Sequence, residues 1–335
     1  MTVSATHRRW LWLALRALVT VAIVAFLFYK IEWTQLVAKM READYRWLAL
    51  ACACFGAAAM FGAVRWWYLL RIQDIALPLR VVTILTLIGQ FFNSFMFGAV
   101  GGDVVKALYV YRYAPGRKTH ATLSVLIDRA LGLFILLCGS LAVLPWQLRT
   151  LHGTEAANAA LVALIVVFAL MIAGGLALFY TPFHRAPARL RTLWKRVPHH
   201  LIAELIVSGF RQHGRAPGLT LGSVAAGIAV TLVLVAGGYC IARGIGLPAG
   251  YLELLVIITV AICVTSLPIS IGGHGVREGI FVLMFAAFGA IALESEGGRE
   301  NAILFSVLFF AVPLVWSLVG GVMYLTFRHE RRPQG

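Results

Sequence analysis

Three glycines, an aspartate and a lysine stand together in residues 97–107, FGAVGGDVVKA, within an otherwise apolar stretch. A bilayer core has no water to satisfy backbone groups, and a charged side chain at its centre costs about 2.5–3.5 kcal/mol on insertion scales. Asp103 and Lys106 therefore predict a polar binding site rather than a plain membrane span. Gly101 and Gly102 would let the chain break at this point and let a ligand approach the backbone.

A second segment, residues 268–279 with the sequence PISIGGHGVREG, repeats this pattern. Both segments read as a β-branched residue, Gly-Gly, a polar residue, any residue, valine and a base, and they lie 171 residues apart. His274 follows the second glycine pair, and the base Arg277 is followed by Glu278. Paired glycines can serve only to bring helices close together, but the charged residues attached to both pairs favour a binding site.

A third charged element is the adjacent pair Asp128 and Arg129, in the segment IDRALGL. The pair is expected at the start of the span that follows the first glycine pair. It can belong to the same binding site, or it can be a neutralised pair at the membrane interface. Arg65 stands at the end of an earlier span and is interpreted as an arginine that snorkels to the interface. Arg65 is therefore left out of the predicted site.

The composition predicts a membrane protein. Of the 335 residues, 61% are hydrophobic and 13% are charged, whereas soluble domains carry about 25% charged residues. The net charge of +15 is concentrated in loops beside apolar segments, as the positive-inside rule predicts, so it does not indicate a nucleic-acid partner. The five cysteines lie in apolar segments without metal-ligand spacing. The sequence therefore predicts neither a metal site nor a cofactor.

The order of apolar segments predicts an all-α polytopic membrane protein with about six full spans and two broken or re-entrant helical hairpins. The spans are expected near residues 10–29, 47–64, 121–145, 158–180, 219–241 and 302–327, and the hairpins at about 81–111 and 251–293. The first hairpin lies between two basic loops and has about 31 residues, whereas two full spans and a turn need roughly 40. It is therefore expected to enter and leave from the cytoplasm. The second hairpin is long enough to be re-entrant or to form two full spans.

The charges of the loops give the two halves of the chain opposite orientations. Basic residues place both termini and the segment 181–217 in the cytoplasm, and the acidic loop 294–300 is expected outside. Residues 1–150 then form one membrane repeat, and residues 151–335 form a second repeat with inverted topology. Inverted repeats with broken helices are typical of secondary transporters.

On these motifs the chain resembles the flippase-like membrane domain of bacterial lysylphosphatidylglycerol synthases and its stand-alone relatives, some of them encoded with hopanoid-lipid genes. The family pattern is Pro-Gly-Ser-x-Gly-Gly-Asp-x-x-Arg, then Asp-Arg-x-x-Gly, then Pro-x-Ser-x-Gly-Gly-x-Gly-x-Arg-Glu. The first motif departs from the pattern, because Phe97 and Ala99 replace proline and serine, and Lys106 keeps the charge of the arginine but loses its two-point geometry. The second motif is present as Asp128, Arg129 and Gly132, and the third is complete, with Pro268, Ser270, Gly272, Gly273, Gly275, Arg277 and Glu278.

The resemblance implies a lipid flippase or transporter of the bacterial inner membrane, with a polar or anionic lipid headgroup held between the two hairpins. The bases Lys106, Arg129 and Arg277 would bind a phosphate or another anionic group. The acids Asp103, Asp128 and Glu278 would balance these bases when the site is empty, or would bind a cationic part of the headgroup or a coupling proton. The expected substrate-binding residues are Gly101, Gly102, Asp103, Lys106, Asp128, Arg129, Pro268, Ser270, Gly272, Gly273, His274, Gly275, Arg277 and Glu278.

Two other functions stay open. A membrane-embedded transferase acting on lipid or polyprenyl-linked substrates would need a general base and usually a metal site, and the chain has no Asp-x-Asp motif. A non-transporting partner of lipid-modifying enzymes would leave the charged hairpins unexplained. The soluble aminoacyl-transfer domain of the synthases is not found in the 335 residues, so synthase activity is not expected. We expect a membrane lipid as the partner and no enzymatic activity.

Overall fold

A computed structural model describes residues 43–95, 101–147, 216–266, 276–292 and 296–326, and the single positions 162 and 169. Every regular element within the continuous ranges is an α-helix. The helices are α3 (Tyr45–Ile72), α4 (Leu79–Phe95), α5 (Gly101–Tyr113), α6 (Lys118–Gln147), α10 (Pro217–Gly244), α11 (Tyr251–Ser266), α12 (Val276–Ala287) and α13 (Glu296–Thr326). The expected span near residues 10–29 lies outside these ranges, as does the one near 158–180 except for the two single positions.

Four of the described helices, α3, α6, α10 and α13, are long and apolar enough to cross a membrane. Each has at least 28 residues, which at 1.5 Å per residue gives about 42 Å, more than the roughly 30 Å of a hydrocarbon core. The prediction of an all-helical polytopic membrane protein is confirmed. The first predicted hairpin corresponds to α4 and α5 and the second to α11 and α12, and none of these helices exceeds 17 residues.

Helices α3 and α10 end in the same way. After α3, the amide of Ile75 donates to the carbonyl five residues earlier at 2.9 Å, and Asp74 has a φ of 55°. After α10, the amide of Leu247 donates to the carbonyl five residues earlier at 2.8 Å, and Gly246 has a φ of 71°. A left-handed residue just beyond a helix end is a common stop signal, and it turns the chain into the next helix. Here the next helix is the first member of a short pair in both cases.

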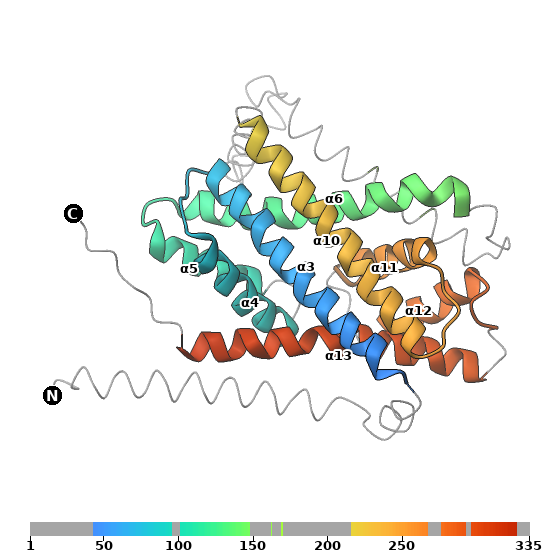
Figure 1. The fold of residues 1–335 in the computed structure, drawn as a ribbon. Coiled ribbons are helices and arrows are strands. Elements are labelled where there is room, and N and C mark those ends of the chain that lie inside the picture. The colour runs from blue at the N-terminus through green and yellow to red at the C-terminus, as the bar shows by residue number, and fades with distance from the viewer. Residues whose placement is uncertain are drawn as a thin grey trace, which may run out of the picture.

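Figure 1 shows α3 and α10 running side by side through the middle of the structure, with α4 and α5 on one side of them and α11 and α12 on the other. Helix α13 packs against α4, and helix α6 packs against α11. The described helices form two halves, α3–α6 and α10–α13. The last helix of each half therefore contacts the first short helix of the other half. The two halves interlock rather than forming separate bodies.

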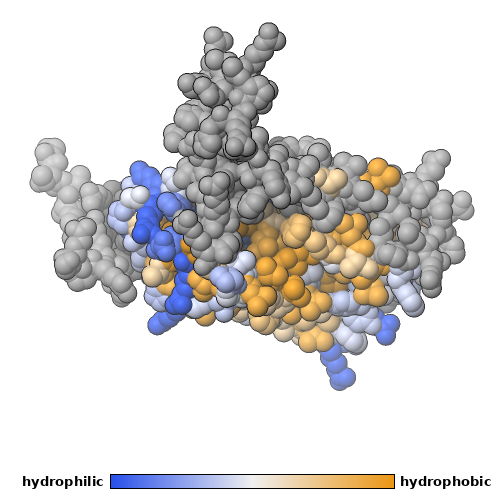
Figure 2. Space-filling view, turned by 90° about the horizontal axis from the view of Figure 1, so that it is seen from above, coloured by the Kyte–Doolittle hydropathy of each residue, from blue (hydrophilic) through white to orange (hydrophobic). Residues whose placement is uncertain are grey.

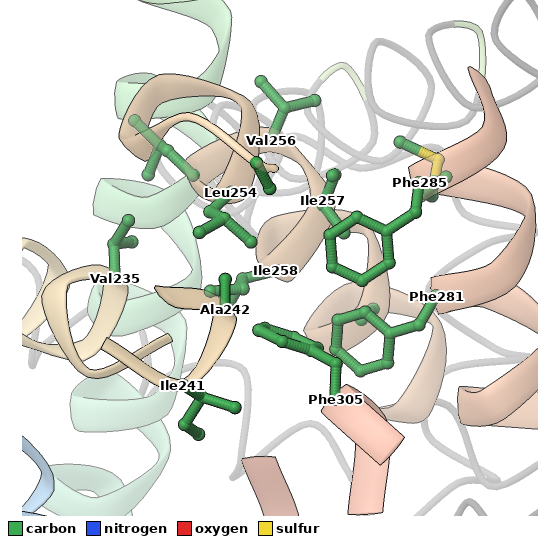
Figure 3. Packing of buried hydrophobic residues seen from close by; sticks show 14 of the residues in the cluster. Val235, Ile241, Ala242, Leu254, Val256, Ile257, Ile258, Phe281, Phe285 and Phe305 are labelled. Atoms are coloured by element: carbon green, nitrogen blue, oxygen red, sulfur yellow. The ribbon is translucent and has the colours of Figure 1, made fainter. Parts of the chain in front are cut away.

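An aromatic core joins α12 to α13. The ring centroids of Phe281 and Phe285 lie 5.1 and 5.0 Å from the ring of Phe305, and the three side chains face one another in Figure 3. Ile257 and Ile258 of α11 are fully buried beside them. Such edge-on aromatic pairs add about 0.5–1.5 kcal/mol each beyond the area that they bury. The second half is therefore built around a dense apolar centre.

The outer faces of the long helices are apolar. Leu232 of α10 and Val322 of α13 are 52% and 62% exposed, although their side chains are wholly apolar. Figure 2 shows hydrophobic residues gathered over the middle of the visible face and hydrophilic residues toward its margins. An apolar outer belt of this kind is what contact with lipid requires, because lipid tails are as apolar as the side chains that meet them.

The backbones of α4 and α5 touch at a pair of glycines. A Cβ atom added to Gly102 of α5 would overlap the carbonyl oxygen of Gly89 of α4. A Cβ atom added to Gly89 would lie 2.8 Å from the side chain of Lys106. Glycine at both positions lets the two short helices approach closely, which is the packing role that the sequence left open for paired glycines. Because Gly89 has no side chain, the side chain of Lys106 fits beside it.

Candidate functional site

Lys106, Arg65 and Asp128 meet inside the protein, one from each of three helices. Arg65 Nε on α3 donates to Asp128 Oδ1 on α6 at 2.7 Å, and Lys106 Nζ on α5 lies 4.0 Å from Asp128 Oδ2. Between 10% and 12% of each of these three side chains is exposed. Lys106 Nζ also lies 4.7 Å from the ring centroid of Trp66, in cation–π contact. One buried carboxylate thus faces two cations, and the distance to the lysine is too long for a hydrogen bond.

A second ion pair joins α5 to α6. Arg129 Nε donates to Asp103 Oδ2 at 2.6 Å, and the Asp103 side chain is the more buried of the two, 15% exposed against 33%. Asp103 stands three positions before Lys106, so the two side chains are neighbours on the surface of α5. The acid of α5 therefore pairs with a base of α6, while the base of α5 faces an acid of α6. Charges of both signs are shared across the contact between the two helices.

The structure corrects two expectations about these residues. Asp128 and Arg129 do not begin a helix, because α6 starts ten positions earlier at Lys118, and each pairs with another helix rather than with its neighbour. Arg65 does not snorkel to an interface, because its side chain is 11% exposed and is bound to Asp128. The sequence holds a signal for Arg65 in Ala58 and Gly62, small residues that precede it at helical spacing and indicate a face turned toward other helices.

A cavity of about 380 Å³ lies beside this charged cluster, within the range of about 300–1,000 Å³ that is usual for small-molecule sites. Four polar side chains of α4 line it at helical spacing, and they add hydroxyl and amide groups to the charges. The wall formed by α3 consists mainly of small residues. The described residues that line it are Ala58, Ala59, Gly62, Arg65, Thr86, Gln90, Asn93, Ser94, Lys106, Asp128, Val230 and Phe310.

The first glycine pair connects to this cavity through Asn93. Gly102 is the second residue of α5, where an amide has no acceptor inside its own helix. Its N–H donates to Asn93 Oδ1 at 2.8 Å. Asn93 therefore caps the first turn of α5, and the same side chain lines the cavity. Gly101 is the first residue of α5 and is half-buried.

Arg277 and Glu278 form a separate charged centre at the start of α12. Arg277 Nη2 donates to Glu278 Oε1 at 2.9 Å, and Arg277 Nε donates to the hydroxyl of Ser306 on α13 at 3.0 Å. The guanidinium carbon lies 4.9 Å from the ring centroid of Phe310. The Arg277 side chain is 11% exposed. Its charge is thus balanced by the neighbouring acid, and α13 holds it at two points.

The predicted site residues fall into three groups. Lys106 and Asp128 line the cavity, and Gly101, Gly102, Asp103 and Arg129 lie on the same two helices beside it. Arg277 and Glu278 are not among the residues that line the cavity. The predicted residues Pro268, Ser270, Gly272, Gly273, His274 and Gly275 lie outside the described ranges.

The cavity has the chemistry of an anion site. Among the lining residues that the structure describes, Arg65 and Lys106 supply two positive charges and Asp128 supplies one negative charge, so one positive charge is not balanced by the others. A buried charge without a counterion is costly, and an anionic ligand would remove that cost. Within the ranges that the structure describes, no group of three or more His, Cys, Asp and Glu side chains could hold a metal ion. The arrangement is suited to binding an anionic group.

One comparison with known proteins bears on the whole chain. The family described as "Lysylphosphatidylglycerol synthase TM region" matches residues 13–321. The matched range includes all three motifs and every described residue that lines the cavity. No curated protein matches the sequence.

Proposed function

Because the chain belongs to the family of the lysylphosphatidylglycerol synthase transmembrane region, we propose that it is a lipid flippase that holds an anionic headgroup in the cavity of Arg65 and Lys106. The headgroup would enter the cavity while the lipid tails stay in the bilayer. The protein would act in the inner membrane of a bacterium, with both termini in the cytoplasm. It would transport a lipid without changing it chemically.

The unbalanced positive charge of the cavity is the observation that carries this proposal. Asp128 accepts a hydrogen bond from Arg65 but lies 4.0 Å from Lys106 Nζ. Lys106 can therefore give its three N–H donors to a ligand without losing a hydrogen bond to Asp128. A phosphodiester carries one negative charge, which matches the single excess positive charge of the described lining residues. The polar side chains of α4 would bind the uncharged part of the headgroup.

The arrangement of the helices supports two inverted repeats as the framework of the flippase. Helices α3 and α10 both have 28 residues, and α10 begins at Pro217, 172 positions after α3 begins at Tyr45. The following short helices, α4 and α11, begin at Leu79 and Tyr251, again 172 positions apart. The contacts of α13 with α4 mirror those of α6 with α11. We propose that residues 1–150 and 151–335 are the two repeats, each with one broken hairpin.

The lengths of the short helices support a hairpin that returns to its own side of the membrane. Helix α4 has 17 residues and α5 has 13, which gives about 25 and 20 Å at 1.5 Å per residue. Both lengths are below the roughly 30 Å of the hydrocarbon core. A hairpin of this size would end inside the hydrocarbon core. The start of α5, with Asp103 in its first turn, would then lie at that depth.

A transport assay on the purified chain tests the proposal. The chain is reconstituted into liposomes that contain a trace of fluorescent phosphatidylglycerol, and quenching of the outer leaflet measures how fast the lipid changes leaflet. We expect faster exchange than in protein-free liposomes and at least roughly tenfold loss of the added rate in Lys106→Gln, because a hydrogen bond to a charged group contributes about 1.5–3 kcal/mol. Arg80→Gln is the control, since Arg80 is exposed at the start of α4.

The same assay separates transport from the alternatives. Mass spectrometry of the recovered lipid reports whether its headgroup has been changed, with and without an added polyprenyl-phosphate donor. Transport with an unchanged lipid supports the flippase. A modified lipid would support a transferase, and the absence of exchange with anionic and with zwitterionic lipids would contradict the flippase.

A further inference from the structure

We infer that Phe310 of α13 separates the cavity from Arg277, and that displacement of this one ring adds Arg277 to the binding site. The inference rests on the proposed function, because it concerns the same headgroup cavity. It goes beyond that function because it assigns a gate between the two charged centres. Neither the sequence motifs nor the family match includes an assignment for Phe310.

Phe310 touches both centres. Its side chain lines the cavity together with Arg65 and Lys106. The guanidinium carbon of Arg277 lies 4.9 Å from the centroid of the same ring, yet Arg277 is not among the residues that line the cavity. The ring therefore stands between a cavity that holds an unbalanced positive charge and a further cation. An arginine over an aromatic face is held by the ring quadrupole, so the ring both hides Arg277 and holds it.

The other partners of Arg277 keep it beside the ring. Ser306 accepts a hydrogen bond from Arg277 Nε and stands one helical turn before Phe310 on α13. Glu278 neutralises the guanidinium from the adjacent position at 2.9 Å. Arg277 is thus charge-balanced in this conformation without any ligand. In this proposal, displacement of the Phe310 ring is the step that exposes Arg277 to the cavity.

Helix α13 has a weak point next to Phe310. Pro313 lies inside the helix, three positions later, and has no amide hydrogen to donate to the carbonyl of residue 309. Helices bend or open where such a bond is missing. The preceding residue, Phe309, packs among aromatic rings, 5.5 Å from Phe55 and 5.8 Å from Phe305. The gate residue therefore lies between a fixed aromatic core and a turn with fewer hydrogen bonds.

The two ring positions would give the cavity two different chemistries. With the ring in place, Arg65 and Lys106 bind the anionic group from the side of α3 and α5, and Asp128 partly neutralises them. With the ring displaced, the planar guanidinium of Arg277 reaches the same group from the side of α13 and can bind two of its oxygens. A headgroup would then be held from both halves of the chain. This is the arrangement in which a headgroup could be passed between the two halves.

Thiol labelling tests the gate without any lipid. In a chain whose five native cysteines are replaced, Ser306→Cys reports the compartment of Arg277, and Ser94→Cys reports the cavity. Both serines are changed to a side chain of similar size, and the reagent is a water-soluble methanethiosulfonate. We expect Phe310→Ala to speed labelling of Ser306→Cys by roughly tenfold or more, the change expected when a minor open state becomes the main one. Labelling of Ser94→Cys should change less than about twofold.

The matched control is Leu318→Ala, which trims a side chain that is 42% exposed on the same helix. It should change neither labelling rate. If Phe310→Ala leaves the labelling of Ser306→Cys unchanged, Phe310 is not a gate and the inference is wrong. Phe310→Leu is used if the alanine variant does not fold, since leucine keeps an apolar side chain but lacks the aromatic face that holds Arg277. It should give an intermediate rate.

A binding measurement then connects the gate to the headgroup. The probe is a fluorescent short-chain phosphatidylglycerol added to the full chain in detergent. Arg277→Gln should change affinity less than about twofold when Phe310 is present and weaken it roughly tenfold in the Phe310→Ala background, because Arg277 then binds the charged group directly. Equal effects in both backgrounds would overturn the inference. If Lys106→Gln has no effect in either background, the proposed headgroup site is wrong, whereas the labelling result still decides whether Phe310 is a gate.

Discussion

Asp128 of α6 accepts a hydrogen bond from Arg65 of α3 at 2.7 Å, although 63 positions separate the two residues in the chain. The pair connects the first long helix of the described structure to the last helix of the same half. It also fixes the carboxylate so that its other oxygen faces Lys106. Asp128 is therefore the residue on which the charge balance of the cavity depends.

We predict that Asp128→Asn strongly destabilises the fold. It leaves two buried cations without their carboxylate, and breaking a buried pair by removing one partner costs about 3–5 kcal/mol. The control is Asp74→Asn, because Asp74 lies 3.7 Å from Arg117 with a side chain that is 75% exposed. Exposed pairs contribute about 0–1 kcal/mol. Chemical unfolding in detergent, followed by circular dichroism, measures both, and similar losses for the two variants would contradict the role given to Asp128.

The structure explains why the second motif has a glycine at position 132. A Cβ atom added there would lie 2.7 Å from Arg65 Nη1, so an alanine must shift this end of the guanidinium, whereas the hydrogen bond to Asp128 is made by Nε. We expect Gly132→Ala to fold with a free energy of unfolding within about 1 kcal/mol of the wild type. Its affinity for the fluorescent phosphatidylglycerol should fall roughly tenfold, the loss expected for one charged hydrogen bond.

Gly139→Ala on the same helix is the control for this variant. A Cβ atom there would make ordinary contacts at 3.8 and 3.9 Å with the two methyl groups of Leu255. Lipid affinity should be unchanged in Gly139→Ala. A normal affinity in Gly132→Ala would show that the position of Arg65 does not matter for binding.

The sequence predicted the fold class because membrane helices are encoded locally. Long apolar runs, basic loops and glycine breaks each have a physical reason that needs no partner segment. The same reasoning located Lys106 and Asp128, since a charge within an apolar run is visible in the sequence alone. It could not show that these two residues face each other, because α5 and α6 are brought together by tertiary packing.

Arg65 and Phe310 show what local reasoning misses. Arg65 stands next to Trp66 and Trp67, an order typical of a membrane interface, and only the positions of α6 and α10 place it inside. Phe310 is one of several aromatic residues in an apolar run, and nothing in its neighbours distinguishes it from Phe309. One of the two rings packs in the core and the other lines the cavity. That difference depends on the rotation of α13 against helices far away in the sequence.

We predict that Gly102→Ala prevents normal packing of α4 on α5. The added methyl group would overlap the carbonyl oxygen of Gly89, which is backbone and cannot turn away. Loss of folded protein, or destabilisation above about 3 kcal/mol, is expected. Gly62→Ala is the contrast, because a Cβ atom there meets nothing within 4 Å and alanine in a helix interior is favoured by about 0.5–1 kcal/mol. Thermal unfolding of the two variants in the same detergent measures the difference in stability. Equal stability of the two variants would contradict the close approach of α4 and α5 at Gly102.

The inverted orientation of the two repeats can be measured with single cysteines. Thr119→Cys near the start of α6 and Gly297→Cys near the start of α13 are both exposed. In intact cells, an impermeant thiol reagent should label Gly297→Cys and should label Thr119→Cys only after the membrane is opened. Labelling of both from the same side would contradict the inverted repeats. A reagent that crosses the membrane controls for reactivity.

The contact between α4 and α13 is both close and hydrogen-bonded. Gly320 of α13 lies against the carbonyl oxygen of Leu87, and Gly321 lies against the ring of Phe91. A hydrogen bond of 2.8 Å between the hydroxyls of Ser317 and Ser94 joins the same two helices. Since α4 also packs against α5 at Gly89, a displacement of α13 would carry the two short helices with it as one body. The lysine of the cavity would then change depth in the bilayer while its own hairpin keeps its shape.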